Sequence, residues 1–101
     1  MKQELQVIID RINSFGNYND VFFEEYKLLV KEALKVLGNY KGEASEMLDT
    51  WKDMAIGELT AELDNRLENG FLELKPEKKK SEFIFSKSTV SLSLTNVLMH
   101  L

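Results

Sequence analysis

The chain has 101 residues, no cysteine and a net charge of −4, with 17 acidic and 13 basic residues. This length fits a single domain over residues 1–101, and the lack of cysteine excludes disulfide scaffolds, cysteine-based metal sites and cysteine nucleophiles. Since no apolar stretch approaches the roughly 20 residues that span a bilayer, the sequence indicates a cytoplasmic protein with no membrane partner.

The N-terminal part of the chain shows two helical patterns, each followed by a glycine. The first pattern predicts a helix over about residues 2–15, with a left-handed C-terminal cap at Gly16. A turn at residues 17–20 then supplies an acceptor for the N-terminus of a second helix, which Gly38 closes in the same way. The apolar positions of the two stripes are Leu5, Ile8, Ile9, Ile12 and Phe15, followed by Phe23, Tyr26, Val30, Ala33 and Leu37.

A third helix is predicted between residues 43 and 68, where apolar residues recur at steps of three or four. Gly57 is its weak point, costing roughly 1 kcal/mol against alanine, and the helix either continues or bends there. Gly70 ends the pattern, and Trp51 falls on the apolar stripe, which places it in the core. The stripe comprises Ala44, Leu48, Trp51, Ala55, Leu59, Leu63 and Leu67.

Beyond Gly70 the period of the pattern changes from helical to alternating. Leu72 and Leu74 share one face, residues 76–80 form a charged turn, and residues 82–85 predict a returning strand. A third strand is expected over about residues 88–95, where Ser and Thr alternate with apolar residues. Val90, Leu94, Val97, Leu98 and Leu101 also fit a helix. The sequence therefore predicts an α+β fold, helical over residues 1–70 and β-rich over residues 71–101.

Few residues in the chain are suited to catalysis or to metal binding. His100 is the only histidine and stands next to the end of the sequence. This position disfavours a catalytic triad or a histidine metal site. Carboxylate pairs at i, i+4 are typical of the charged side of an amphipathic helix, and no phosphate-binding glycine loop is present. We therefore expect no enzymatic activity, no metal and no cofactor.

The strongest charge pattern is acidic: residues 43–68 hold 8 acids and 2 bases. Such a surface fits a basic protein partner and disfavours nucleic acid. This pattern predicts a small acidic inhibitor or immunity-type protein that neutralises a basic partner such as a nuclease toxin; the alternative is a merely solvated helix face. The candidate contacts are Glu46, Asp49, Asp53, Glu58, Glu62 and Asp64, with Tyr18, Tyr40 and Trp51 as anchors if exposed.

A second hypothesis comes from the stretch Leu63–Leu74, which resembles the end of a winged-helix recognition helix and the start of its wing. The resemblance implies a DNA-binding regulator whose wing is the 71–86 hairpin, with Lys78, Lys79 and Lys80 at its basic tip. Residues 58–68 hold 4 acids and 1 base, which is a poor surface for a DNA groove. Alternatively, the lysines are a solvated hairpin tip that protects a sheet edge. The oligomeric state stays open.

Overall fold

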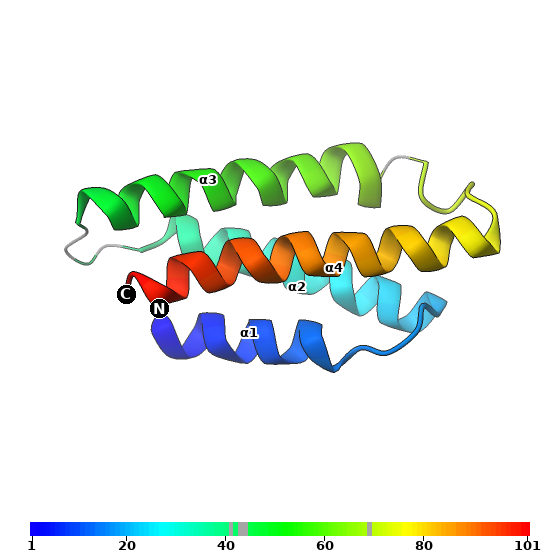
Figure 1. Ribbon diagram of the computed structural model, residues 1–101, viewed down its shortest axis with the longest axis horizontal. Helices are drawn as coiled ribbons and strands as arrows, with labels where there is room; N and C mark the ends of the chain where they lie inside the picture. The colour runs from blue at the N-terminus through cyan, green and yellow to red at the C-terminus, as the bar shows by residue number, and fades with distance from the viewer. Residues whose placement is uncertain (41, 43–44, 69) are drawn as a thin grey trace.

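The computed structural model describes residues 1–40, 42, 45–68 and 70–101, which form an up-and-down helical bundle (Figure 1). A short π-helical segment, η1, continues the third helix by one turn before the last connection. The elements are α1 (Lys2–Ser14), α2 (Asp20–Gly38), α3 (Glu46–Glu62), η1 (Leu63–Leu67) and α4 (Pro76–Met99).

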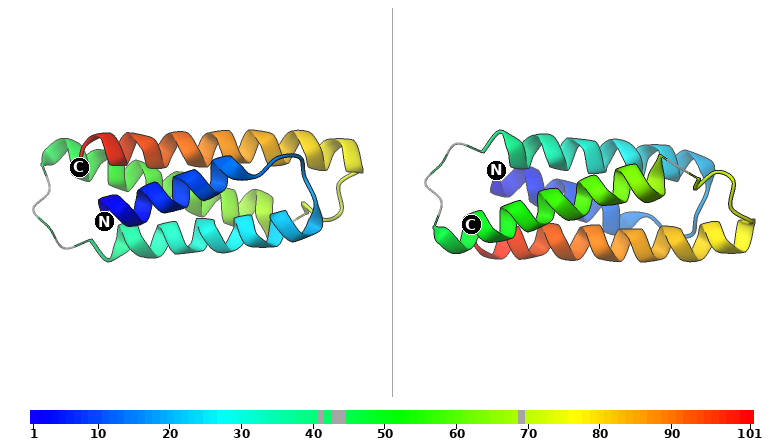
Figure 2. Two further views of the ribbon diagram at one scale, coloured as in Figure 1. Left: turned by 90° about the horizontal axis from the view of Figure 1, so that it is seen from below. Right: turned by 90° about the horizontal axis from the view of Figure 1, so that it is seen from above.

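Each helix packs against the helix before it and the helix after it, and α4 closes the bundle by returning beside α1. The two views in Figure 2 show the chain termini at the same end of the bundle, which is elongated along the helix axes. Its principal extents are 44 × 23 × 17 Å. Of the helices in the described residues, none is long and apolar enough to cross a membrane.

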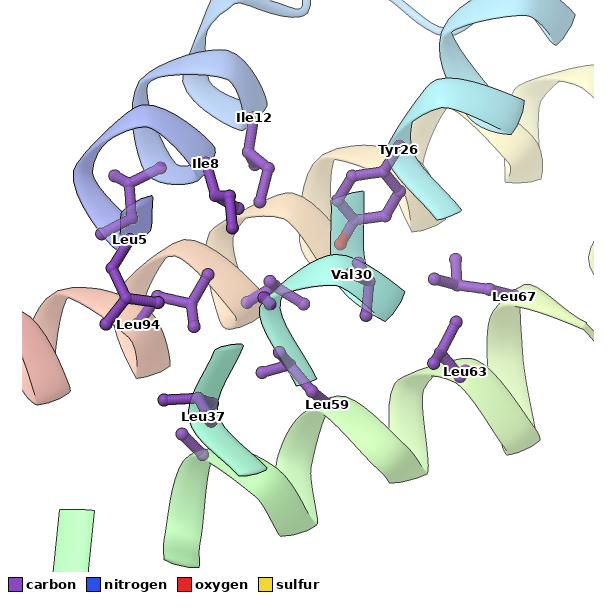
Figure 3. Close-up of a cluster of buried hydrophobic side chains, with 14 of the residues drawn as sticks. Leu5, Ile8, Ile12, Tyr26, Val30, Leu37, Leu59, Leu63, Leu67 and Leu94 are labelled. Carbon is purple, nitrogen blue, oxygen red and sulfur yellow. The ribbon is translucent and has the colours of Figure 1, made fainter. Parts of the chain in front are cut away.

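One hydrophobic core runs along the bundle axis, and every helix contributes to it (Figure 3). The apolar stripes of α1 and α2 are buried as their spacing predicts. Their buried members are Leu5, Ile8, Ile9, Ile12, Phe23, Tyr26, Val30, Ala33 and Leu37, and the third stripe adds Leu48, Ala55, Leu59, Leu63 and Leu67. Ala44 lies outside the described residues.

The helix ends confirm the predicted N-cap and correct the predicted C-caps. Asn19 accepts a hydrogen bond from the Phe22 amide at 2.8 Å, as a capping side chain should. Gly16 and Gly38 do not form left-handed caps. Among the described glycines, only Gly70, with φ 83°, has the positive φ of the left-handed conformation. α3 also runs continuously through Gly57.

The prediction of an α+β fold is wrong, because the described part of residues 71–101 contains no strand. The expected hairpin over residues 71–86 and the expected strand over residues 88–95 are replaced by turns and by the 24 residues of α4. Pro76 is the first residue of that helix, where its missing amide hydrogen costs nothing and its fixed φ favours helix. The helical alternative for the last segment is therefore the correct one.

The turn between η1 and α4 is held by an aromatic contact instead of by strand pairing. Gly70 adopts a left-handed conformation, and the next residue, Phe71, is buried in the core. The Phe71 ring stacks on the ring of Phe23, with the centroids 4.2 Å apart and the planes 10° apart. Leu72, which the alternating pattern assigned to a strand, is exposed.

Candidate functional site

The six predicted acidic contacts separate into two groups in the structure. Glu46, Asp49 and Asp53 are exposed along the outer face of α3, and we call these three residues the acidic surface. Lys52 lies 3.6 Å from Asp49, Nζ to Oδ1, and its side chain is mostly buried. Asp64 is also exposed, but it lies in η1, beyond the end of α3.

Glu58 and Glu62 turn toward α4 and bind its serines. Glu58 accepts a hydrogen bond from the Ser93 hydroxyl. Glu62 is buried and accepts a hydrogen bond from the Ser86 hydroxyl at 2.8 Å. Both carboxylates bond α3 to α4. Burial removes Glu62 from the surface, whereas Glu58 stays exposed while it accepts from Ser93.

A buried polar chain joins α2, α3, η1 and α4 through Glu62. Because Ser86 donates to Glu62, its oxygen accepts from the Tyr26 hydroxyl, which lies 2.7 Å away. On the other side, Arg66 Nε lies 3.1 Å from Glu62, and a second nitrogen of the same guanidinium binds Glu82. Burial raises the pKa of Tyr26, which keeps its hydroxyl a neutral donor. Sequence reasoning missed this polar chain.

The polar chain is arranged for structure, since its charges and donors already have partners. Every buried polar side-chain atom in the described residues has a hydrogen-bond partner. Arg66 is neutralised by two carboxylates, which leaves little of its charge to attract an anion. Within the same residues, no group of three or more His, Asp or Glu side chains is placed to hold a metal ion.

The three lysines of the second hypothesis lie in the first turns of α4 and not on a wing. The DNA-binding alternative required the 71–86 hairpin, and the described residues contain no such hairpin. Lys78 and Lys80 are exposed, whereas Lys79 is half-buried with its Nζ 5.9 Å from the centre of the Tyr18 ring. The lysines lie at the opposite end of the bundle from the start of α3 (Figure 1), where Glu77 and Glu82 stand beside them in the sequence.

The three aromatic residues predicted as anchors are all partly buried. Tyr18 packs its ring against Phe71 and Phe83, with centroids 5.6 Å away in both cases. Trp51 stacks on the His100 ring at 5.5 Å, so its placement on the apolar stripe is confirmed only in part. Tyr40 lies under the Lys52 ammonium, 5.8 Å from its ring centre. The three rings therefore contribute more to the packing of the fold than to a binding surface.

The outer side of α4 is a surface that sequence reasoning missed. Between residues 83 and 99, Lys87 is the single charged residue. A helix exposed to water normally carries charges on its outer side, so the lack of charge distinguishes α4 from the other helices. The sequence carries this signal, but the alternation of Ser and Thr with apolar residues predicts a strand and hides it.

Comparisons of the chain with protein-family models, with curated proteins and with solved structures found no match in any of the three.

Proposed function

We propose that this chain is a non-catalytic protein-binding module that recognises a basic protein through the acidic surface. The observation that carries the proposal is that Glu46, Asp49 and Asp53 are exposed together within the first eight residues of α3. Two of them, Glu46 and Asp49, stand in the first turn, where the helix dipole stabilises negative charge. The fold therefore tolerates this concentration of charge without needing a bound cation.

A carboxylate cluster of this kind favours a partner with a positively charged cleft. Complementary charge accelerates association and excludes partners of the wrong sign. The partner class that fits is a basic protein such as a nuclease toxin, which the chain would neutralise as an inhibitor or immunity-type protein in the cytoplasm. Asp64 extends the same charge along the axis of α3 and η1.

The proposal is tested by reversing the acidic surface and comparing the result with an equal reversal elsewhere. The test variant carries Glu46→Lys, Asp49→Lys and Asp53→Lys. The control carries Glu24→Lys, Glu32→Lys and Glu73→Lys, which are also exposed and change the net charge equally. Each immobilised protein is exposed to native lysate, retained proteins are identified by mass spectrometry, and the affinity of a purified partner is then measured by calorimetry.

We expect a protein of high isoelectric point to bind the parent chain and the control, and to bind the test variant at least about tenfold more weakly. Equal losses in both variants would mean that net charge, and not this surface, determines binding. Retention of no basic protein by the parent chain would contradict the proposal outright.

A further inference from the structure

The outer side of α4 combines large exposed apolar side chains with small polar ones. Ile84, Leu92 and Met99 are 52%, 63% and 75% exposed and recur at helical spacing. Ser88, Ser91 and Thr95 fill the positions between them, and we call these six residues the uncharged face. Phe85 borders it and is 58% exposed although the Arg66 guanidinium covers its ring at 4.7 Å.

The one charge in this stretch of α4 stands at the border of the uncharged face, since Lys87 lines the same shallow groove as Ile84, Ser88, Ser91, Leu92 and Thr95. Lys87 Nζ donates to the carbonyl oxygens of Phe15 and Gly16, at 2.8 and 3.1 Å, and so caps the C-terminal end of α1. Burial lowers the pKa of Lys87, which is the cost of placing an ammonium against backbone in this way. The ammonium is thus tied to α1, and the six residues of the uncharged face carry no charge of their own.

We propose that the uncharged face binds the same face of a second copy of this chain, with the two α4 helices antiparallel. A two-fold axis at Ser88 places Ile84 of each copy against Leu92 of the other, because both stand four residues from the axis. The small side chain of Ser88 then permits close approach of the helices. Such a pairing is self-complementary in shape and needs no other partner.

Charge supports a second copy as the occupant. The antiparallel arrangement places the first turns of α4 of each copy, with the exposed Glu77, Lys78 and Lys80, opposite the end where its partner's α4 finishes. Beside that end, α3 begins with the exposed Glu46 and Asp49, since Trp51 of α3 stacks on His100. Two lysines of each copy therefore approach two carboxylates of the other at each end of the contact, whereas a parallel pairing would bring lysine against lysine.

The uncharged face is long and narrow. From Ile84 to Met99 it spans about 23 Å at the rise of an α-helix, and one helix is about 10 Å wide. This area is well below the roughly 800 Å² per partner of a standard interface, so we expect a weak dimer whose contact extends onto the flank of α3. Met54 belongs to that flank, because it lines the shallow seam between the two helices together with Ser93 and Asn96.

The first test measures the mass of the full chain by sedimentation equilibrium over a range of concentrations. We expect a monomer–dimer equilibrium that Leu92→Glu weakens at least about tenfold, because the carboxylate would be buried without a partner. Leu28→Glu is the matched control, since Leu28 lies on α2 and is 65% exposed. Ser88→Lys is a second disrupting variant at an exposed position where the fold does not depend on the side chain.

The second test asks whether the charged ends meet as the antiparallel pairing requires. One variant carries Lys78→Glu and Lys80→Glu, and the other carries Glu46→Lys and Asp49→Lys. Each alone places like charges at both ends of its own dimer and should dimerise more weakly. An equimolar mixture restores opposite charges at both ends, so native mass spectrometry should show the mixed dimer in excess of either self-dimer.

A monomer at every concentration would overturn the proposal, as would a dimer that Leu92→Glu and Ser88→Lys leave unchanged. A dimer that these variants weaken, but whose mixed charge variants show no preference for each other, would overturn the antiparallel register. The function proposed above is tested separately, because Leu92→Glu leaves Glu46, Asp49 and Asp53 in place.

Discussion

The hydroxyl of Tyr26 lies 2.7 Å from the hydroxyl of Ser86, although 60 residues separate the two in the sequence. This contact fixes how far α4 slides along α2, because a one-turn displacement of α4 would separate Ser86 from both Tyr26 and Glu62. A buried polar group that is satisfied in only one arrangement is a specificity device for a bundle whose core is otherwise built mainly from apolar side chains.

The buried serine provides the first prediction. Ser86→Ala should lower the free energy of unfolding by about 1–3 kcal/mol, because Tyr26 loses its acceptor and Glu62 loses a donor. Ser88 is exposed on the same helix. Ser88→Ala should therefore change the free energy of unfolding by less than about 0.5 kcal/mol. Urea denaturation of both variants measures the difference, and equal effects would show that the polar chain contributes nothing to stability.

Alkaline pH should destabilise the bundle through Tyr18. Burial, followed by the hydrogen bond to Asp20, raises the pKa of Tyr18 from 10.0 to about 12 in the folded chain. A raised pKa means that the folded state holds the Tyr18 proton more tightly than the unfolded state. The resulting contribution to the free energy of unfolding is complete below about pH 10 and is lost as the pH rises toward about 12. Urea midpoints measured from neutral to strongly alkaline pH should therefore fall less steeply for Tyr18→Phe than for the parent chain; parallel slopes would contradict the assignment.

The N-terminus of α4 should be open to stabilisation. Lys75 occupies the N-cap and makes no side-chain hydrogen bond, whereas Ser45 caps α3 by accepting from the Leu48 amide at 3.1 Å. Lys75→Ser should raise the free energy of unfolding by about 1 kcal/mol, because the new hydroxyl can accept a hydrogen bond from the Lys78 amide in the same way. Ser45→Ala should remove a similar amount. Thermal unfolding measures both, and a destabilising Lys75→Ser would contradict the position of this helix start.

Two glycines should respond in opposite directions to the same change. A Cβ at Gly57 meets nothing within 4 Å. Gly57→Ala should therefore stabilise α3 by about 0.5–1 kcal/mol. Gly70 has φ 83°. A residue with a side chain is strained in this left-handed conformation, so Gly70→Ala should lower the free energy of unfolding by about 1–2 kcal/mol. Chemical denaturation distinguishes the two, and stabilisation by both would be inconsistent with a left-handed Gly70.

Of the α-helices in the described residues, α1, α2 and α3 could be predicted from local patterns because their buried positions are almost all apolar. α4 could not, since its core positions include Ser86 and Ser93 between Phe83, Val90, Leu94 and Val97. A buried serine breaks the apolar stripe that identifies a helix. The partners of these serines, Glu62 and Glu58, lie 24 and 35 residues away, so no local window of the sequence shows that the hydroxyls are satisfied.

The acidic surface was predictable only in part for a related reason. Charge density alone treats every carboxylate of α3 as part of one surface. Glu62, however, stands seven residues after Ala55 and three after Leu59, which places it on the buried stripe. The helical position of Glu62 could therefore have predicted its burial and distinguished it from the exposed Glu46. The sequence does not show, however, that Ser86 and Arg66 would bind its carboxylate.

The contact between Trp51 and His100 joins the single tryptophan of the chain to its single histidine. Indole emission from this protein therefore arises at one place, where the last turn of α4 lies against α3. Detachment of that turn would expose the indole to water and shift its emission to longer wavelength while the rest of the bundle stays intact. The chain thus carries an intrinsic optical probe of fraying at its C-terminal end, readable without any attached dye.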